Sequence, residues 1–231
     1  MHVVIVTGRM FQSVRRYAAE AGIDDPVVCY QGAVVAEPTT GEFLRHVPIP
    51  LELARETIAA LAEGAWPINC YVDDELYVAE HTAESATYAE FQELVVHAVG
   101  PLLDWLERPP TKLVVVNDPE RLDGREVEMK ERFGGRLFIS KSLPYFLEFA
   151  AADVSKGSGL AFLAEHLGFA QERTVGIGDG ENDRELLDWA GYAIAVENAH
   201  PDLKRRADAI IPGPEDEGVA ALIETYLDSR P

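Results

Sequence analysis

A glycine-rich acidic stretch late in the chain has the residue types of a metal site. It reads GIGDGENDREL, with Asp179 and Asp183 four residues apart and Asn182 between them. A predicted strand ends at Ile177, and a helix is predicted to start near Asn182. Carboxylates in such a loop suit Mg²⁺, which takes one or two of them and keeps several waters. Helix capping also favours Asp and Asn, but it does not require the whole Gly-Asp-Gly-x-Asn-Asp stretch.

A lysine at a predicted helix start is the second candidate. In DVSKGSGL, Ser155 is a plausible N-cap, which puts Lys156 in the first helical turn. The positive end of the helix dipole disfavours a lysine there, unless an anion lies in front of both. The alternative is an exposed lysine that tolerates a small penalty, and the spacing alone leaves both interpretations open.

The third candidate is VVIVTGR, where a strand is predicted to end. The Thr7 hydroxyl and the Gly8 amide could bind phosphate oxygens, although, for this segment taken alone, a simple N-cap is the favoured interpretation. All three segments are expected at strand–helix junctions, where α/β sheets bind ligands. A hydroxyl, a lysine and paired carboxylates together suit phosphoryl transfer, in which positioning and charge neutralisation supply most of the catalysis.

The elements that must position these residues follow an α/β order interrupted in the middle. A strand over Met1–Val6, a helix from Phe11 to about Gly22 and two short strands around Gln31-Gly32 predict a β-α-β opening with a parallel sheet. Helices and strands alternate again from Asp153 onward.

The middle of the chain predicts a different unit. Its order is α-β-β-α-β-α-β-β, with a hairpin turn at Asp73-Asp74 and a helix over about 85–98, which indicates an antiparallel α+β unit. We therefore expect an α/β fold with core parts at 1–45 and 150–231 and an inserted domain at 46–149.

Composition narrows the class of protein. The 231 residues carry 40 acidic and 20 basic side chains, a net charge of -20, which argues against nucleic acid as a partner. Cys29 and Cys70, without a CxxC motif, indicate a reduced cytoplasmic protein rather than a disulfide or zinc framework. No apolar run approaches roughly 18 residues, so no membrane span is expected. The start lacks the pattern of a signal peptide, and the oligomeric state stays open.

The whole chain resembles the haloacid dehalogenase-like superfamily, and most of all its Cof-type phosphatases. The resemblance rests on TGR, QGA (the family more often has Asn-Gly-Ala), VSKG, GDGENDREL and the tail AVENAHPDLKRRADAIIPGPEDEGVAALI, in this order. It implies a Rossmann-like parallel-sheet core with an inserted α+β cap domain. It also implies Mg²⁺-dependent hydrolysis of a small phosphorylated metabolite, such as a sugar phosphate.

The same resemblance implies roles for individual residues. Thr7 would bind the transferring phosphoryl group, and Lys156 would neutralise its oxygens. Asp179 would bind Mg²⁺, and Asp183 would hold the metal or its waters. The expected catalytic residues are Thr7, Lys156 and Asp183; the expected phosphate-binding residues are Thr7, Gly8, Lys156, Asn182 and Asn198; the expected metal ligands are Asp179 and Asp183.

One family motif has no counterpart in this sequence. The family works through an aspartyl-phosphate, formed on the first Asp of an Asp-x-Asp-Gly-Thr motif in the first core strand. Asp24-Asp25 and Asp73-Asp74 match neither its pattern nor its place. We therefore expect that the nucleophile strand is missing from this chain and that the chain as given is inactive without an upstream segment. The alternative is a non-catalytic pseudoenzyme that binds a phosphorylated ligand or regulates a partner.

Overall fold

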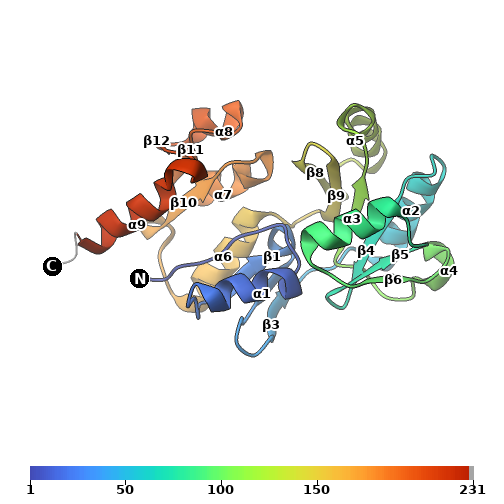
Figure 1. Cartoon of the computed structure of the whole chain (residues 1–231), viewed down its shortest axis with the longest axis horizontal. Helices are drawn as coiled ribbons and strands as arrows, with labels where there is room; N and C mark the ends of the chain where they lie inside the picture. The colour runs from blue at the N-terminus through green and yellow to red at the C-terminus, as the bar shows by residue number, and fades with distance from the viewer. Residues whose placement is uncertain (229–231) are drawn as a thin grey trace.

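The chain folds around one large sheet and two small ones. The computed structural model describes residues 1–228, and Figure 1 shows the large sheet on one side of the molecule and the small ones on the other. The small sheets have the strand orders β1-β2-β3 and β10-β11-β12, and we call them the core sheets. The six-stranded sheet, of order β6-β5-β4-β7-β9-β8, is the cap sheet. Only strands from the middle of the chain build the cap sheet, as an inserted unit requires.

The first core sheet contains most of the predicted opening elements. Gly22, at φ 64, follows the first helix as its predicted C-terminal glycine, and the two short strands around Gln31-Gly32 pair antiparallel. A further strand, absent from our expectation, extends the sheet. The elements are α1 (Phe11–Glu20), β1 (Val27–Cys29), a 3₁₀ turn η1 (Tyr30–Gly32), β2 (Val34–Ala36) and β3 (Phe43–His46).

The strand predicted over Met1–Val6 is wrong as a regular strand. Only Val6 forms a bridge, parallel to Val28. Val28 N donates to Ile5 O at 2.9 Å, and Thr7 N donates to Val28 O at 2.8 Å. The segment is thus bonded to β1 on one side, and within residues 1–228 no strand pairs with its other side. A lone bridge does not make the run of pairs that defines a strand.

The second core sheet is parallel throughout, as expected. Ile177 on β10 lies opposite Ile194 on β11, which in turn lies opposite Ala209 on β12. The helix predicted from about Asn182 divides into a 3₁₀ turn and an α-helix. The elements are α6 (Lys156–Leu167), η2 (Gln171–Arg173), β10 (Val175–Gly178), η3 (Glu181–Asp183), α7 (Arg184–Trp189), β11 (Tyr192–Val196), α8 (Pro201–Arg206), β12 (Ala209–Ile211), η4 (Pro214–Asp216) and α9 (Gly218–Asp228).

The inserted unit contains the predicted hairpin but not the full predicted helix over 85–98. Asp73 and Asp74 form the turn at φ 51 and 59. The helix stops because Glu93 adopts a left-handed conformation at φ 58, and the residues after it pair in parallel with β5. The elements are α2 (Leu51–Ala62), β4 (Ile68–Val72), β5 (Glu75–Val78), α3 (Ala83–Gln92), β6 (Val96–Ala98), α4 (Leu102–Trp105), β7 (Lys112–Val116), α5 (Pro119–Phe133), β8 (Leu137–Leu143) and β9 (Phe146–Ala151).

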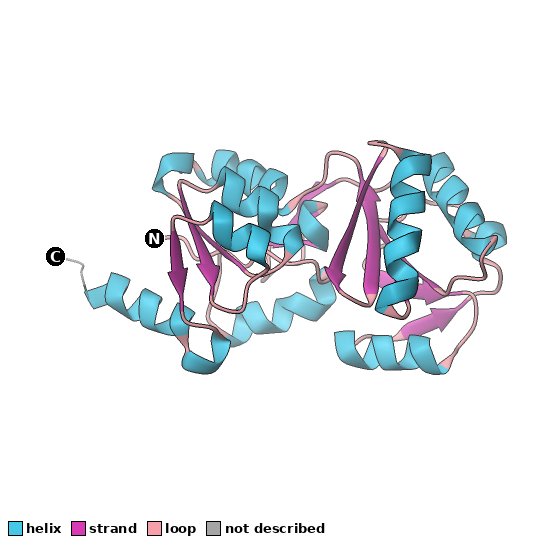
Figure 2. Ribbon diagram, turned by 90° about the horizontal axis from the view of Figure 1, so that it is seen from above, coloured by secondary structure: helices cyan, strands magenta, loops and turns pink. Residues whose placement is uncertain are grey.

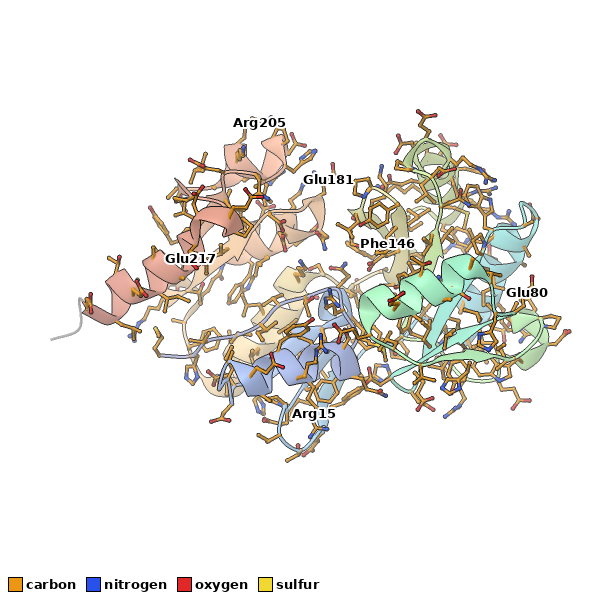
Figure 3. The ribbon with its side chains drawn as sticks, viewed as in Figure 1. Arg15, Glu80, Phe146, Glu181, Arg205 and Glu217 are labelled. Carbon is orange, nitrogen blue, oxygen red and sulfur yellow. The ribbon has the colours of Figure 1, made fainter. Side chains whose placement is uncertain are left out.

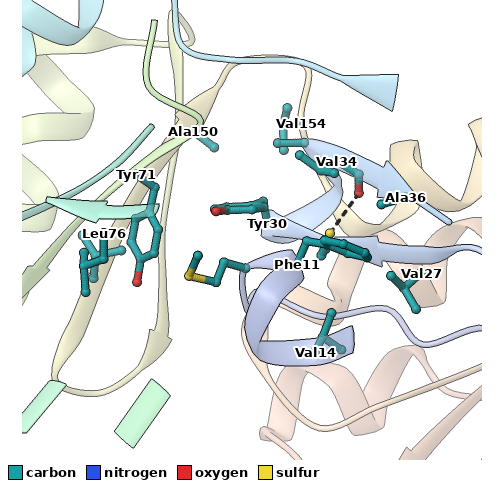
Figure 4. Packing of buried hydrophobic residues seen from close by; sticks show 14 of the residues in the cluster. Phe11, Val14, Val27, Tyr30, Val34, Ala36, Tyr71, Leu76, Ala150 and Val154 are labelled. Atoms are coloured by element: carbon teal, nitrogen blue, oxygen red, sulfur yellow. Dashed lines mark hydrogen bonds between the residues drawn. The ribbon is translucent and has the colours of Figure 1, made fainter. Parts of the chain in front are cut away.

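Aromatic side chains pack between the core and the cap sheet. Tyr30 of the core and Tyr71 of β4 meet edge to face, with ring centroids 5.7 Å apart, and Figure 4 shows the two rings approaching from opposite sides. The Tyr71 hydroxyl lies 2.6 Å from that of Tyr88. These side chains belong to one buried apolar cluster that continues into α1 through Phe11 and Val14. The two units therefore share a packed boundary.

The tip of the cap hairpin supplies a helix cap to the core. Met10 precedes α1 and offers no capping side chain. Instead, the Asp74 carboxylate accepts hydrogen bonds from Phe11 N and Gln12 N, both at 3.0 Å, and from the Tyr30 hydroxyl at 2.8 Å. A carboxylate at a helix N-terminus satisfies free amides and the helix dipole. The predicted turn is therefore also a contact between cap and core.

The predicted α/β class is confirmed, and Figure 2 shows helices on both sides of the core strands, with the cap beside them. Both cysteines are buried and free. None of the helices within residues 1–228 has the length and apolar character needed to cross a bilayer. The boundaries at 45/46 and 149/150 stay a prediction.

Candidate active site

The anion in front of α6 is the carboxylate of Asp183. Lys156 Nζ forms a short ion pair with Asp183 Oδ1, and the two side chains are 9% and 6% exposed. Ser155 is the N-cap, as predicted: its hydroxyl accepts from Ser158 N at 3.0 Å. The buried pair explains the unusual lysine in the first turn, because the Asp183 carboxylate neutralises the ammonium that the helix dipole disfavours there.

Backbone amides hold the other oxygen of Asp183. Asp179 N and Gly180 N each donate to Asp183 Oδ2 at 3.0 Å. A Cβ on Gly178 would lie 2.6 Å from the Asp183 Cβ, so this turn requires a glycine. The loop of residues 178–183, which we call the acidic loop, is therefore organised around one carboxylate.

A second glycine, Gly157, allows α6 to pack closely enough on α7 for Lys156 to reach the acidic loop. A Cβ on Gly157 would lie 2.3 Å from the carbonyl oxygen of Glu185. Because that oxygen belongs to the backbone of α7, a larger residue would push α6 and α7 apart. The Lys156–Asp183 contact thus depends on Gly157.

Asp179 lies beside this pair, on the solvent-exposed side of the acidic loop. Partial desolvation raises the pKa of its carboxyl, and the nearby Asp183 carboxylate raises it further, while the Lys156 ammonium opposes both. A divalent cation would relieve the repulsion between the two carboxylates. Within residues 1–228 no group of three or more His, Cys, Asp or Glu side chains could hold a metal. Two carboxylates nevertheless fit Mg²⁺, which keeps waters and takes phosphate oxygens as its other ligands.

Hydrogen bonds fix the conformation of the Thr7–Gly8 loop and its contact with the Tyr30–Gly32 turn. Gln31 N donates to Thr7 O at 3.1 Å, and the Thr7 hydroxyl accepts from Arg9 N at 3.2 Å. The next residue along the turn, Gly32, packs directly on α6: its Cβ would lie 2.0 Å from Ser155 O. The Tyr30–Gly32 turn therefore brings the Thr7 loop and the start of α6 together.

Two residues of the cap sheet belong to this site. Lys112 Nζ donates to Gly8 O at 2.8 Å and lies 3.4 Å from Glu148 Oε2. The same Glu148 oxygen accepts from Gln31 Nε2 at 3.0 Å, and Gln31 Oε1 accepts from Asn182 Nδ2 at 3.1 Å. A continuous buried polar chain therefore runs from the cap sheet to the acidic loop.

Part of this arrangement was predictable from the sequence. Lys156, Asp179, Asn182 and Asp183 come together as predicted, whereas Asn198 is exposed after β11, and no hydrogen bond among the described residues joins it to them. Glu148 was missed, although a charged residue inside the apolar run FLEFAA was the available signal.

A cleft opens beside the acidic loop, between core and cap. Its volume is about 430 Å³, and β8 lines it on one side and η3 with α7 on the other. Figure 3 shows Glu181 at the edge of the core that faces the cap. The polar lining includes Lys130, Ser140, Glu181 and Arg184, so a charged, hydrated molecule fits beside Glu181 of the acidic loop.

Comparisons with known proteins show the family of the chain and solved structures with the same fold. A family model described as haloacid dehalogenase-like hydrolase matches residues 1–223. A crystal structure of a Thermotoga maritima protein superposes with a TM-score of 0.82 at 30% identity, over 97% of this chain and 84% of that one. The 5-amino-6-(5-phospho-D-ribitylamino)uracil phosphatase of Bacillus subtilis is 23% identical over 98% of this chain and 85% of its own length. The HMP-PP phosphatase of Serratia proteamaculans is 24% identical over 99% and 84%.

Proposed function

The chain belongs to the haloacid dehalogenase-like hydrolase family, and on that premise we propose that it is a Mg²⁺-dependent phosphatase acting on a small phosphorylated metabolite, such as a sugar phosphate. The observation that carries the proposal is the buried Lys156–Asp183 pair with Asp179 beside it. The Bacillus subtilis and Serratia proteamaculans relatives named above are phosphatases of small phosphorylated molecules, which supports the same chemistry here.

Each residue of the site has a role in this proposal. Lys156, oriented by Asp183, would neutralise the phosphoryl oxygens, and the Thr7 hydroxyl would donate a hydrogen bond to one of them. Gly8 and Asn182 border the same site and would contact the phosphoryl group. When bound, Mg²⁺ would be held by Asp179 and Asp183 and would neutralise charge on the phosphoryl group. Asn198 stays a weaker candidate for phosphate binding.

The nucleophile lies outside these residues in our proposal. Hydrolysis through an aspartyl-phosphate needs a carboxylate between the Thr7 loop and the acidic loop. In the described part of the chain, β10 pairs with β11 alone, and Val6 pairs only with Val28. We propose that an additional strand fits between these two free edges and carries the nucleophilic aspartate. The 231 residues would then bind ligand without turning it over.

The inserted unit at 46–149 would act as a cap over this site. Lys112 already reaches from the cap sheet to Gly8, so the cap sheet lies close enough to contact the leaving group and exclude water. The free buried thiols of Cys29 and Cys70 support a reducing compartment, such as the cytoplasm.

Calorimetric titration with MgCl₂ tests the metal site in the chain as given. Asp179→Asn should weaken Mg²⁺ binding by at least about tenfold, since losses of that size already follow changes to residues that merely orient ligands. Asp188→Asn, an exposed carboxylate on α7 that pairs with Arg206, is the matched control and should bind Mg²⁺ as the wild type does. Equal affinities in both variants would remove Asp179 from the site.

Turnover of an aryl phosphate tests the nucleophile. The 231-residue chain should show no Mg²⁺-dependent turnover. A protein extended by an in-frame upstream Asp-x-Asp-Gly-Thr strand should turn over and lose about 10²–10³ in kcat on Lys156→Met. Turnover by the chain as given, abolished by Asp179→Ala, would show that the nucleophile lies within it. A stop codon before any such motif would favour a non-catalytic binding protein.

A further inference from the structure

Gln31 is held in a backbone conformation that glutamine rarely adopts. It is 1% exposed, with φ 60 and ψ 19, between Tyr30 at φ 52 and Gly32 at φ 100. The left-handed region suits glycine and asparagine, whereas a longer side chain is disfavoured there. Such a conformation persists only where surrounding contacts impose it, and it is concentrated at functional sites.

Both ends of the Gln31 amide are used, and they point to different parts of the molecule. Oε1 accepts from Asn182 of the acidic loop at 3.1 Å, and Nε2 donates to Glu148 of the cap sheet at 3.0 Å. Asn182 and Glu148 are 8% and 4% exposed. Gln31 is therefore a single side chain that bonds to the loop of the two aspartates and to the cap.

The cap end of this link is also bonded to the Thr7–Gly8 loop. Glu148 pairs with Lys112 at 3.4 Å, and Lys112 donates to Gly8 O at 2.8 Å. The Gln31 amide packs against Gly8, whose Cβ would lie 2.4 Å from Nε2. In such a buried network each bond is stronger than in water, and breaking one leaves a neighbour unsatisfied. A displacement of the acidic loop should therefore also shift the side chains at the cap-sheet end of this network.

We propose that Gln31 is a positioning residue that couples the acidic loop to the cap sheet, so that ligand binding at Lys156, Asp179 and Asp183 tightens the packing of the cap. The inference rests on the proposed function, because that function assigns the ligand, Mg²⁺ with a phosphoryl group. Asparagine would suit the backbone better, but its side chain is one methylene shorter and cannot bond to both Asn182 and Glu148. The longer glutamine side chain therefore spans the distance between the two partners, although its backbone conformation is unfavourable.

Hydrogen exchange with and without MgCl₂ and orthophosphate tests the coupling. In the wild type, the two ions together should slow exchange in residues 176–187 and also in residues 137–151 of the cap sheet. We expect the slowing in the cap to be about fivefold, the lower end of ordinary coupling between sites. In Gln31→Asn, residues 176–187 should still be protected, and the protection of 137–151 should disappear.

Two further variants make the result specific. Gln12→Asn makes the same substitution at another glutamine that crosses the boundary, where Gln12 Nε2 donates to Asp74 O at 2.7 Å; it should keep the cap response. Asn182→Ala cuts the link at its other end, and it should lose the response of residues 137–151 while residues 176–187 stay protected, which shows that the ligand is still bound. Circular dichroism should show both Gln31→Asn and Gln12→Asn folded at the assay temperature.

The outcomes separate the inference from the proposed function. Protection of 137–151 that survives in Gln31→Asn would overturn the coupling role of Gln31. So would wild-type protection confined to residues 176–187, which leaves the proposed function standing. No protection in either segment of the wild type would overturn the proposed function, and the inference with it.

Discussion

Removal of the buried ammonium of Lys112 is the sharpest test of how core and cap are held together. Lys112 and Glu148 are 4% and 5% exposed at their side chains, with 3.4 Å between Nζ and Oε2. Lys112→Met keeps the length and packing of the side chain but leaves the Glu148 carboxylate buried without its counter-charge. Breaking a buried pair in this way costs about 3–5 kcal/mol.

The expected magnitude lies near the lower end of that range. Glu148 keeps two donors, Gln31 Nε2 at 3.0 Å and the Ser142 hydroxyl at 2.5 Å, so its charge stays partly compensated. We expect Lys112→Met to lower the free energy of unfolding by about 3 kcal/mol, and the melting temperature by roughly 6–12 °C. The double variant Lys112→Met/Glu148→Gln, which removes both charges, should recover about 1–2 kcal/mol.

Urea unfolding followed by circular dichroism measures these values, and a surface pair provides the control. Lys130→Met removes the same side chain from an ion pair with Glu126 on α5, where Lys130 is 53% exposed, and should cost only about 0.5 kcal/mol. A cost for Lys112→Met no larger than that of the control would refute the buried-charge argument. If the double variant loses as much free energy of unfolding as Lys112→Met and Glu148→Gln lose in sum when measured singly, the coupling between Lys112 and Glu148 is refuted.

Two other predictions concern the contacts between elements. Burial raises the pKa of Asp74 to about 6, so folding favours the protonated carboxyl, and its contribution to stability falls as pH rises towards that value. Relative to Asp74→Asn, the wild type should lose about 1 kcal/mol of its free energy of unfolding between pH 5 and pH 7. Urea unfolding measures both proteins at the two pH values, and a difference between them that is the same at pH 5 and pH 7 would contradict this. Gly157→Ala should destabilise by about 3 kcal/mol or more, since its Cβ meets Glu185 O at 2.3 Å. Gly124→Ala, in the open interior of α5, should stabilise by about 0.5–1 kcal/mol. Urea unfolding measures both glycine variants.

Local chemistry explains which features were predictable. Ser155, Gly22 and the Asp73-Asp74 turn act within a few residues of themselves, through caps and backbone conformations that depend on residue type. The acidic loop was recognisable because two carboxylates and flanking glycines stand within one short stretch. The end of the helix at Gln92 was not recognisable, because Glu93 adopts a left-handed conformation that its residue type does not favour.

The sequence by itself determined the α/β class, the change of architecture in the middle of the chain, and the residue types that suit a phosphate and a divalent cation. Only the tertiary structure decided that the anion facing Lys156 is Asp183, 27 residues away, and that Gln31 meets Glu148 across 117 residues. Periodicity states that a side chain points inward but not which side chain it meets. That partner depends on how separate sheets and helices pack, and no local pattern in the chain records it.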